Sequence, residues 1–189
     1  MKLDTSGTIL WSKTYGGTGV DIGWSVCQTF DGGYAVTGRS DTSFSPFTLF
    51  LIKTDSIGDT IWVKRFVSGF GSIGYSVQQT SDSGYIICGI TSVGANNLDV
   101  YLIKTDSIGN LLWSKTFGDA DTDEGWAVKQ TSDGGYIVTG ERWSLGASIC
   151  LIKTDHNGDS LWTRVYNGSN GYGKSVFQTS DGGYIIGGS

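Results

Sequence analysis

The side chains with the clearest capacity for chemistry are aspartates that open short Asp-x-x-Gly turns: Asp4, Asp55, Asp106 and Asp155. The last copy continues to Asp159 and gathers oxygen atoms of the kind that calcium prefers. An EF-hand-type loop, however, places its ligands at alternate positions and ends on a distant glutamate, and that pattern is absent. Aspartate in a turn commonly folds its side chain back onto the backbone. We therefore predict turn-forming residues and no metal site.

Residues for nucleophilic catalysis are scarce. His156 is the single histidine, and the three cysteines, Cys27, Cys88 and Cys150, have no close spacing. A Ser-His-Asp arrangement needs a base held beside a nucleophile and oriented by a third group, and zinc sites need several Cys or His ligands. The glycine pairs, such as Gly16-Gly17, precede no helix start that would cradle a phosphate. We expect no catalytic residue, no cofactor, and cysteines that act as small apolar residues.

A second set of residues could bind a ligand without transforming it, because aromatic side chains beside acids can stack a sugar or hold a peptide. These candidate ligand-binding residues are Trp24, Tyr75, Trp126, Lys174, Asp21, Asp123, Glu124 and Trp143. The first four have matching positions in a repeat, so we expect them around one axial opening. We expect the aromatic rings to plug that opening and cover its rim, and the alternative is an open mouth that binds a ligand. A glycan-hydrolysing enzyme would need two facing carboxylates at a set separation, and Asp21, Asp123 and Glu124 are the loop acids that could meet.

The repeat itself is marked by two motifs that keep the same period. Asp-Gly-Gly-Tyr or its close variant begins at residues 31, 82, 133 and 181, with offsets of 51, 51 and 48 residues. The second motif runs from a lysine to a tryptophan, as in Lys53 to Trp62. Periods of this size indicate solenoids or propellers. We divide the single domain 1–189 into repeats 11–61, 62–112 and 113–161, with a partial repeat at 162–189 that residues 1–10 complete.

Each repeat is expected to form four short antiparallel strands. In residues 113–161 an alternating segment begins at Trp113, a second runs from Gly125 to Thr131, a third follows the Asp133 turn, and a fourth ends at Thr154. Tight turns join neighbouring strands, whereas the longest loops follow the tryptophan strand and suit the crossing to the next blade. The innermost strands should therefore carry Ser25-Val26, Ser76-Val77, Ala127-Val128 and Ser175-Val176. Helix should be scarce.

Composition supports an all-β protein and restricts its partners. Thirty of the 189 residues are glycine and one is proline, against an average of about 7% glycine. With many aromatic residues present, this composition indicates turns and not disorder. The formal net charge of −5 argues against a nucleic-acid binder, which needs a basic stripe, and against docking on anionic lipid. No stretch approaches the length of a membrane span, and the first residues lack the apolar region of a signal peptide.

The unit Lys-x-Asp-x-x-Gly-x-x-x-Trp, followed by Gly-Gly and later by Asp-Gly-Gly-Tyr-x-x-x-Gly, resembles the repeat of a large group of bacterial and archaeal β-propeller proteins. It is similar to the repeat often written as SBBP and, more distantly, to quinoprotein-type blades. The resemblance implies large secreted or cell-surface proteins of unassigned activity, and so an extracellular or surface location. Such proteins commonly have six to eight blades, whereas four can be counted in this sequence.

Three arrangements remain open: a four-bladed ring, a half-ring that pairs with a second copy into eight blades, or a fragment of a larger propeller. We expect the four-bladed ring, whose last blade is closed by the N- and C-terminal strands, because that pairing covers strand edges that would otherwise aggregate. The near-identical runs 51–58 and 102–109 fit recent duplication or deliberate design. The expected function is a non-catalytic structural or protein-interaction scaffold. The alternative is a carbohydrate-binding or glycan-active domain.

Overall fold

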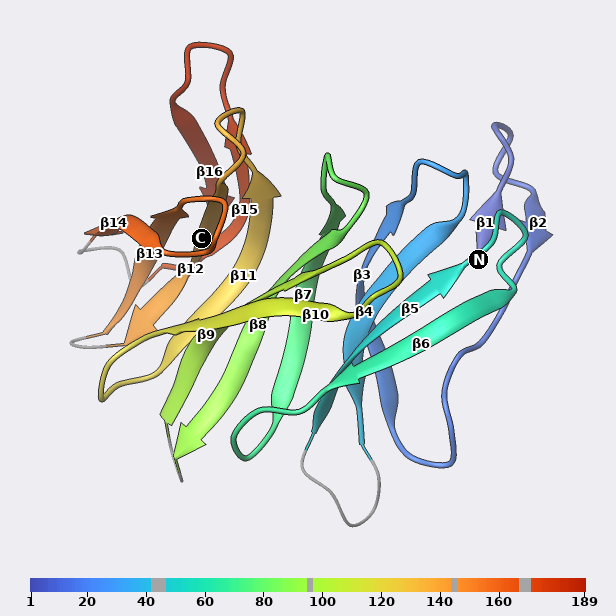
Figure 1. The fold of residues 1–189 in the computed structure, drawn as a ribbon, viewed down its shortest axis with the longest axis horizontal. Coiled ribbons are helices and arrows are strands. Elements are labelled where there is room, and N and C mark those ends of the chain that lie inside the picture. The colour runs from blue at the N-terminus through green and yellow to red at the C-terminus, as the bar shows by residue number, and fades with distance from the viewer. Residues whose placement is uncertain (42–46, 95–96, 144–145, 167–170) are drawn as a thin grey trace.

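Antiparallel β-sheet accounts for all the regular secondary structure that the computed structural model describes, which covers residues 1–41, 47–94, 97–143, 146–166 and 171–189. Within these residues there is no helix, as the sequence predicted. Three sheets have four strands each, ordered β3-β4-β5-β6, β7-β8-β9-β10 and β11-β12-β13-β14. We call these sheets the first, second and third blade (Figure 1).

The strand boundaries follow the predicted repeat closely. The first blade consists of β3 (Asp21–Gln28), β4 (Tyr34–Ser40), β5 (Thr48–Thr54) and β6 (Thr60–Phe66). The second consists of β7 (Ser72–Gln79), β8 (Tyr85–Gly94), β9 (Asn97–Thr105) and β10 (Leu111–Phe117). The third consists of β11 (Asp123–Gln130), β12 (Tyr136–Trp143), β13 (Ala147–Thr154) and β14 (Ser160–Tyr166). Figure 1 shows the tight β3–β4 and β7–β8 turns at one edge of the arc and the loops between blades at the other.

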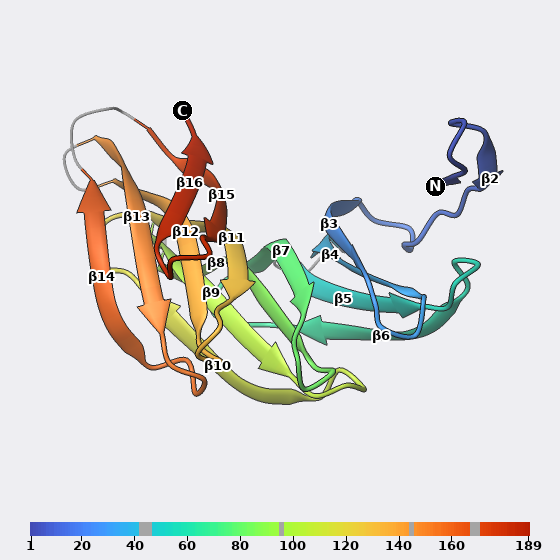
Figure 2. The same cartoon turned by 90° about the horizontal axis from the view of Figure 1, so that it is seen from above.

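Two further pairs of strands flank the three blades. The N-terminal half-blade is β1 (Lys2–Leu3) with β2 (Ile9–Trp11), and the C-terminal half-blade is β15 (Gly173–Gln178) with β16 (Tyr184–Gly188). By position in the repeat, the first is an outer pair of strands and the second is an inner pair. We expected these four strands to join into one closing blade, but they form two separate two-stranded sheets. Figure 2 shows them at opposite ends of an open arc.

The half-blades are held apart because each packs on the blade next to it. Trp11 of β2 contacts the ring of Tyr34 in the first blade, with centroids 5.7 Å apart. Trp162 of β14 contacts Tyr184 of the C-terminal half-blade in the same way, at 5.9 Å. Three complete blades stand between these two contacts. The structure therefore shows stacked four-stranded sheets without ring closure inside one chain.

Adjacent blades are joined by hydrogen bonds between their first strands and by apolar packing that extends over their middle strands. Ser25 Oγ of β3 accepts a hydrogen bond of 3.2 Å from the Val77 amide of β7, and Ser76 Oγ accepts one of 3.3 Å from the Val128 amide of β11. Between the blades lie apolar clusters that combine residues of both neighbours. One of them includes Leu51 with Ile87. Burial of such apolar surface is the main stabilising term for the stack.

The repeated aspartates form turns, as predicted. Asp55 Oδ1 accepts hydrogen bonds from the amides of Ile57 at 3.0 Å and Asp59 at 2.8 Å. These bonds explain why the Asp-x-x-Gly motif recurs without any need for a metal ligand. Cys88 and Cys150 are buried free thiols and Cys27 is half-buried. Burial raises the pKa of Cys150 to about 11, which keeps it in the weakly nucleophilic thiol form.

Candidate functional site

A row of side chains from successive innermost strands is the most distinctive group in the structure. Trp24 of β3 meets Tyr75 of β7 edge to face, with ring centroids 5.3 Å apart. Tyr75 in turn stacks on Trp126 of β11 at 4.4 Å and 18° between the ring planes. The ammonium of Lys174 on β15 lies 2.9 Å from the Trp126 ring centroid. The sequence placed these four residues at matching positions, and the structure brings them into one continuous aromatic row.

A β-bulge determines the direction of each side chain in the row. The pairing between β3 and β4 runs Gly23↔Gly38 and then Ser25↔Thr37, which leaves Trp24 without a partner. The same irregularity occurs beside Tyr75, Trp126 and Lys174. A bulge bends its strand and redirects the side chain of the extra residue. Four equivalent bulges therefore turn four side chains away from the alternating pattern of their strands and toward one another.

Close packing requires the glycine before the bulge at Gly74, Gly125 and Gly173, whereas a Cβ at Gly23 would make only an ordinary contact with Val36. A Cβ at Gly74 would collide with Thr37 Oγ1, and one at Gly125 would lie 2.5 Å from Cys88 Sγ. Both obstructing atoms belong to the preceding blade. A glycine inside a strand indicates a bulge or a close backbone approach, so the Gly-aromatic-Ser/Ala-Val segments carried a signal from which the bulges could have been predicted.

Acids line one flank of the aromatic row. Trp126 Nε1 donates a hydrogen bond of 3.4 Å to Glu141 Oε1. Burial, followed by the charge of Glu141, raises the pKa of Glu124, while Lys174 lowers it. Burial, followed by Glu124, raises the pKa of Tyr75 to about 12. Of the predicted acids, Glu124 is therefore the one that the structure places near the row.

The other two predicted acids close loops in different blades. Asp21 Oδ2 accepts a hydrogen bond of 2.8 Å from the Gly17 amide, and Asp123 Oδ2 accepts one of 3.2 Å from the Asp119 amide. The second blade stands between these two residues, so they do not form a facing pair of carboxylates. Trp143 ends β12 and is half-exposed, and no described ring packs against it.

Tyr172 was not anticipated from the sequence and extends the aromatic row. The Lys174 ammonium lies 4.4 Å from its ring centroid, so the cation is held between Tyr172 and Trp126. Cations over aromatic faces are attracted by the ring quadrupole. The spacing Tyr172-x-Lys174 in the fourth repeat, where the other repeats have an aromatic residue at the bulge, was the available signal.

Asp123 is a buried acid whose pKa is strongly raised. It is 3% exposed, and burial, followed by the charges of Asp99 and Asp121, raises its pKa to about 6. Asp123 also borders a cleft of about 350 Å³ between the second and third blades. A carboxyl with such a pKa can act as a general acid. Its loop-closing hydrogen bond and the Arg142 guanidinium, with Nε 3.7 Å from Oδ1, give it an architectural role.

Metal and membrane features complete the description of the site. In the described part of the chain, no three His, Cys, Asp or Glu side chains gather into a group that could hold a metal ion. Nor do these residues include a helix that is long and apolar enough to cross a membrane.

Comparison with known proteins bears on the fold alone. No family model matches the chain, and no curated protein matches it. The crystal structure of a protein of unknown function from Bacteroides caccae, determined at 1.35 Å resolution, is similar, with a TM-score of 0.63 and 12% sequence identity. The similarity covers 96% of this chain and 57% of that chain. The chain thus spans little more than half the length of this structural relative.

Proposed function

We propose that this chain is a non-catalytic β-propeller repeat module of the SBBP-like type, which serves as a structural or protein-interaction scaffold within a secreted or surface protein. The observation that carries the proposal is the aromatic row. Tyr75 stacks on Trp126 and meets Trp24 edge to face, so the two central rings are used in packing between blades and do not line an open axial pocket. The repeated Asp, Lys and Trp residues are likewise engaged in turns and blade-to-blade contacts.

The propeller architecture is supported by the way the blades stack. The first strands of neighbouring blades are joined by hydrogen bonds, and the order of strands within every blade is the same. The half-blades at the two ends have the strands that a further blade would need. A fold that hosts many functions gives no activity by itself, which is why the proposal stops at a scaffold.

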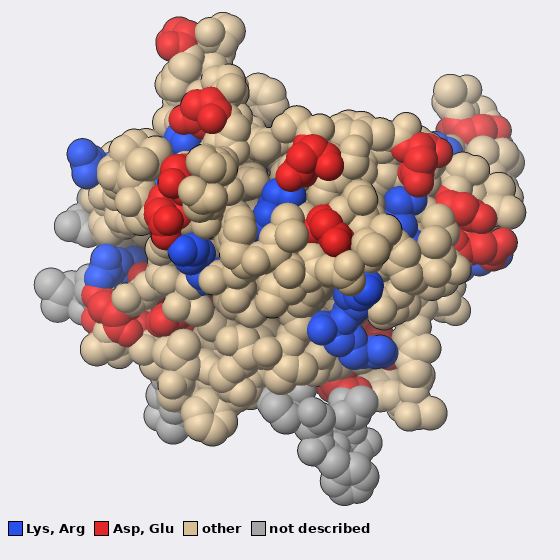
Figure 3. All heavy atoms as spheres, in the orientation of Figure 1, with Lys and Arg blue, Asp and Glu red and all other residues tan. Residues whose placement is uncertain are grey.

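The charge distribution supports protein partners over nucleic acid. On the face drawn in Figure 3, described acidic and basic side chains are interspersed, and the basic ones do not form a continuous stripe. A nucleic-acid-binding surface would concentrate lysine and arginine along one face. The net charge of −5 also disfavours a nucleic-acid partner.

Carbohydrate binding is the second candidate, and one residue favours it. Trp24 ends the aromatic row and is 50% exposed, and it also borders a groove of about 460 Å³ beside the N-terminal half-blade. An exposed indole next to a groove can stack on the apolar face of a sugar ring. Any enzymatic activity toward glycans would in addition need a second carboxylate opposite Glu124.

Titration with soluble oligosaccharides tests the two candidates. We would follow tryptophan fluorescence of the chain with neutral glucose oligomers and with N-acetylglucosamine oligomers at millimolar concentrations. The scaffold proposal predicts no saturable change, and it predicts that Tyr75→Ala lowers the urea midpoint of unfolding because the row loses its central ring. A saturable change that Trp24→Ala abolishes, in a variant with an unchanged unfolding midpoint, would overturn the scaffold proposal in favour of carbohydrate binding.

A further inference from the structure

The two half-blades are complementary parts of one blade. In the second blade, β8 pairs with β9 in the register Tyr85↔Thr105 and Ile86↔Lys104. The C-terminal half-blade has the equivalent of β8 in β16, and the N-terminal half-blade has the equivalent of β9 in β1. Each of these strands pairs on one side only. A strand edge with open N–H and C=O groups is a template for pairing with another strand.

The two open edges also carry the two partners of an ion pair that is not formed in the described structure. Every complete blade joins the aspartate of its Asp-x-Gly-Tyr turn to a buried lysine of its third strand. These pairs are Lys53–Asp31 at 2.8 Å, Lys104–Asp82 at 2.8 Å and Lys153–Asp133 at 2.9 Å. The corresponding residues of the half-blades are Lys2 and Asp181, and among the described residues neither has an ion-pair partner. The two halves of a fourth pair thus lie at opposite ends of the arc.

Apolar side chains that are buried elsewhere are exposed at both ends. Val26 on β3 is 63% exposed, although its equivalents Val77 and Val128 are 4% and 0% exposed. At the other end Ile185 is 62% exposed, whereas Ile86 and Ile137 are fully buried. Each exposed residue lies where a complete stack would place a neighbouring strand. The exposure therefore marks two surfaces shaped by the repeat for burial.

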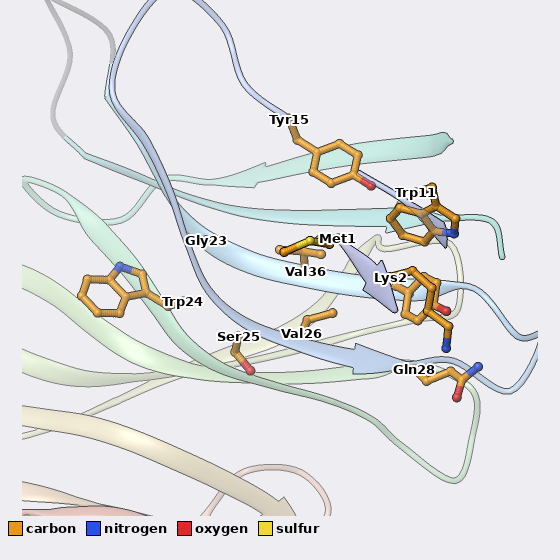
Figure 4. A pocket seen from close by; sticks show the side chains of 11 residues that line it. Met1, Lys2, Trp11, Tyr15, Gly23, Trp24, Ser25, Val26, Gln28 and Val36 are labelled. Atoms are coloured by element: carbon orange, nitrogen blue, oxygen red, sulfur yellow. The ribbon is translucent and has the colours of Figure 1, made fainter. Parts of the chain in front are cut away.

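A groove marks the position of the missing inner strands at the N-terminal end. It encloses about 460 Å³ between the N-terminal half-blade and the first blade. Figure 4 shows Val26 and Val36 lining the groove from β3 and β4, with Met1 and Trp11 lining it from the N-terminal segment. In the complete blades this space is occupied by strands equivalent to β15 and β16.

A polar contact that recurs between neighbouring blades is also incomplete at the two ends. Gln79 Oε1 accepts a hydrogen bond of 2.7 Å from the Phe30 amide, Gln130 Oε1 one of 2.9 Å from Ser81, and Gln178 Oε1 one of 2.9 Å from Ser132. The next contact in this series would join Gln28 Oε1 to the Ser180 amide. In the described structure Gln28 lines the groove, and neither of these atoms takes part in such a bond.

The outer strands show the same complementarity. Gly58, Gly109 and Gly158 each lie against the tryptophan of the preceding repeat, so that an added Cβ would be within 2.8 Å of its ring. Gly7 has the same turn geometry, with nothing within 4 Å of a Cβ, and Trp162 has no turn glycine against it. Tyr15 donates a hydrogen bond of 2.8 Å to the Gly58 carbonyl. Tyr166, its counterpart at the other end, is 49% exposed.

We propose that a second copy of this chain completes the blade: β16 of one copy pairs with β1 of the other, and Asp181 binds Lys2 across the new interface. For each of these contacts, one partner lies at the N-terminal end of the arc and the other lies at the C-terminal end. The surface complementary to each end is therefore the opposite end of another copy of the chain. Within one chain the two half-blades form separate sheets at opposite ends of the arc (Figure 2) and do not close the ring. This inference rests on the proposed scaffold function and names its partner.

Two copies can close the ring. Each copy contributes three complete blades and two half-blades, so a closed pair would have eight blades, at the upper end of the range of about four to eight that propellers typically show. The interface is heterologous, because the β16 end always meets the β1 end, and such interfaces form rings when the rotation closes. Three copies would give a ring beyond the typical range.

Light scattering on a sizing column, applied to the 189-residue chain, tests the proposal. We expect twice the mass of one chain. Lys2→Asp and Asp181→Lys should each raise the dissociation constant at least about tenfold, because like charges then meet across the interface. Asp121→Lys, which makes the same charge change away from both ends, should leave the dimer intact. Circular dichroism and urea midpoints verify that each variant is folded.

Mixing the two single variants is the decisive step. In a mixed pair, the lysine introduced at position 181 of one copy faces the aspartate introduced at position 2 of the other, and the second interface keeps the native Lys2 and Asp181. The mixture should therefore dimerise with a dissociation constant lower than that of either variant alone and close to that of the wild type. Closure within one chain cannot be rescued by mixing. A folded wild-type monomer would overturn the pairing, and so would a dimer whose dissociation constant changes in neither charge-reversal variant.

A cross-link keeps the test valid if a charge variant fails to fold. The register places Lys2 opposite Ile185, so the double variant Lys2→Cys and Ile185→Cys should form covalent dimers under oxidation, and neither single variant should do so. A cross-linked product of monomer mass would overturn the proposal. A monomeric result leaves the scaffold function standing, since the oligosaccharide titration tests that function separately.

Discussion

The ammonium group of Lys104 is buried in the second blade and lies 2.8 Å from a carboxylate oxygen of Asp82, whose side chain is 56% exposed. Lys104 Nζ also donates a hydrogen bond of 2.8 Å to the Thr105 carbonyl. The pair fastens the β7–β8 turn to the third strand of the same blade. Because the lysine is buried and the aspartate is not, the two partners respond differently to removal.

Asp82→Asn should destabilise the chain more than Lys104→Met. The asparagine leaves a buried ammonium without its counter-charge, which costs about 1–3 kcal/mol of unfolding free energy. The methionine removes the buried charge and keeps most of the apolar stem, while the remaining carboxylate turns to water. Urea unfolding of both variants measures the difference. A larger loss in Lys104→Met would contradict this account of the pair.

Ser83→Gly should stabilise the β7–β8 turn. Ser83 has a φ of 66°, and the glycines at the same turn position, Gly32, Gly134 and Gly182, have φ between 81° and 86°. A residue with a Cβ is strained in this region, so relief of the strain should raise the unfolding free energy by up to about 1 kcal/mol, after the greater freedom of glycine in the unfolded chain is subtracted.

The reverse exchange, Gly134→Ser, provides the matched control. Nothing lies within 4 Å of a Cβ at Gly134, so backbone strain is the main cost, and the variant should lose about as much as Ser83→Gly gains. Thermal unfolding of the two variants side by side measures both changes. Equal signs for the two exchanges would show that the turn conformation is not what distinguishes them.

Much of the fold could be predicted from the sequence because the repeat fixes local structure. The Asp-Gly-Gly-Tyr and Asp-x-x-Gly motifs specify turns, and alternation between them specifies strands, so the four-stranded antiparallel sheets and the strand order within each were predicted correctly. Ring closure was expected and is absent within the chain. Closure depends on the angle between blades and on which ends meet, and neither quantity is contained in the sequence of a single repeat.

The candidate site was only partly predictable for a related reason. The matching positions of Trp24, Tyr75 and Trp126 were visible from the period, and so was the choice between a plug and an open mouth. The bulges that turn these side chains toward one another are features of backbone pairing, which alternation alone does not reveal. The separation of Asp21 from Asp123 by a whole blade also depends on tertiary structure.

The turn aspartates should make the chain sensitive to acid. Hydrogen bonds from the Thr131 hydroxyl and then from Lys153 lower the pKa of Asp133 to about 2, below the ordinary value of 3.8. The unfolded chain therefore takes up the proton first as pH falls. The stabilisation by Asp133 is complete above about pH 4 and is lost as pH falls through about 2.

Asp133→Asn should therefore differ from the wild type most above pH 4, and the difference should shrink toward pH 2. Urea midpoints measured between pH 6 and pH 2 give the comparison. Ser132→Ala, which removes an exposed hydroxyl from the same turn and no titratable group, serves as the control and should run parallel to the wild type. A constant gap between Asp133→Asn and the wild type over this range would exclude the pKa difference as its cause.

The contribution of Asp123 to the stability of the chain should depend on pH in the opposite direction. Burial, then Asp99 and Asp121, raise its pKa to about 6, so the folded chain holds the proton more tightly than the unfolded chain does. The stabilisation from the neutral carboxyl is complete below about pH 4 and is lost as pH rises through about 6. Asp123→Asn retains an oxygen that can accept the Asp119 amide hydrogen bond but cannot ionise. It should match the wild type near pH 4 and exceed its stability above pH 6.

Asp21→Asn is the matched control, since Asp21 closes the equivalent loop of the first blade. The Ser40 hydroxyl, followed by the Gly17 amide, lowers the pKa of Asp21, so this substitution should destabilise the chain at neutral pH. Urea midpoints of both variants at pH 4 and pH 7.5 give the comparison, and an NMR titration of the Asp123 carboxyl locates its pKa directly. If Asp123→Asn also destabilised the chain at pH 7.5, the Arg142 guanidinium would outweigh burial, and Asp123 would be ionised in the folded protein.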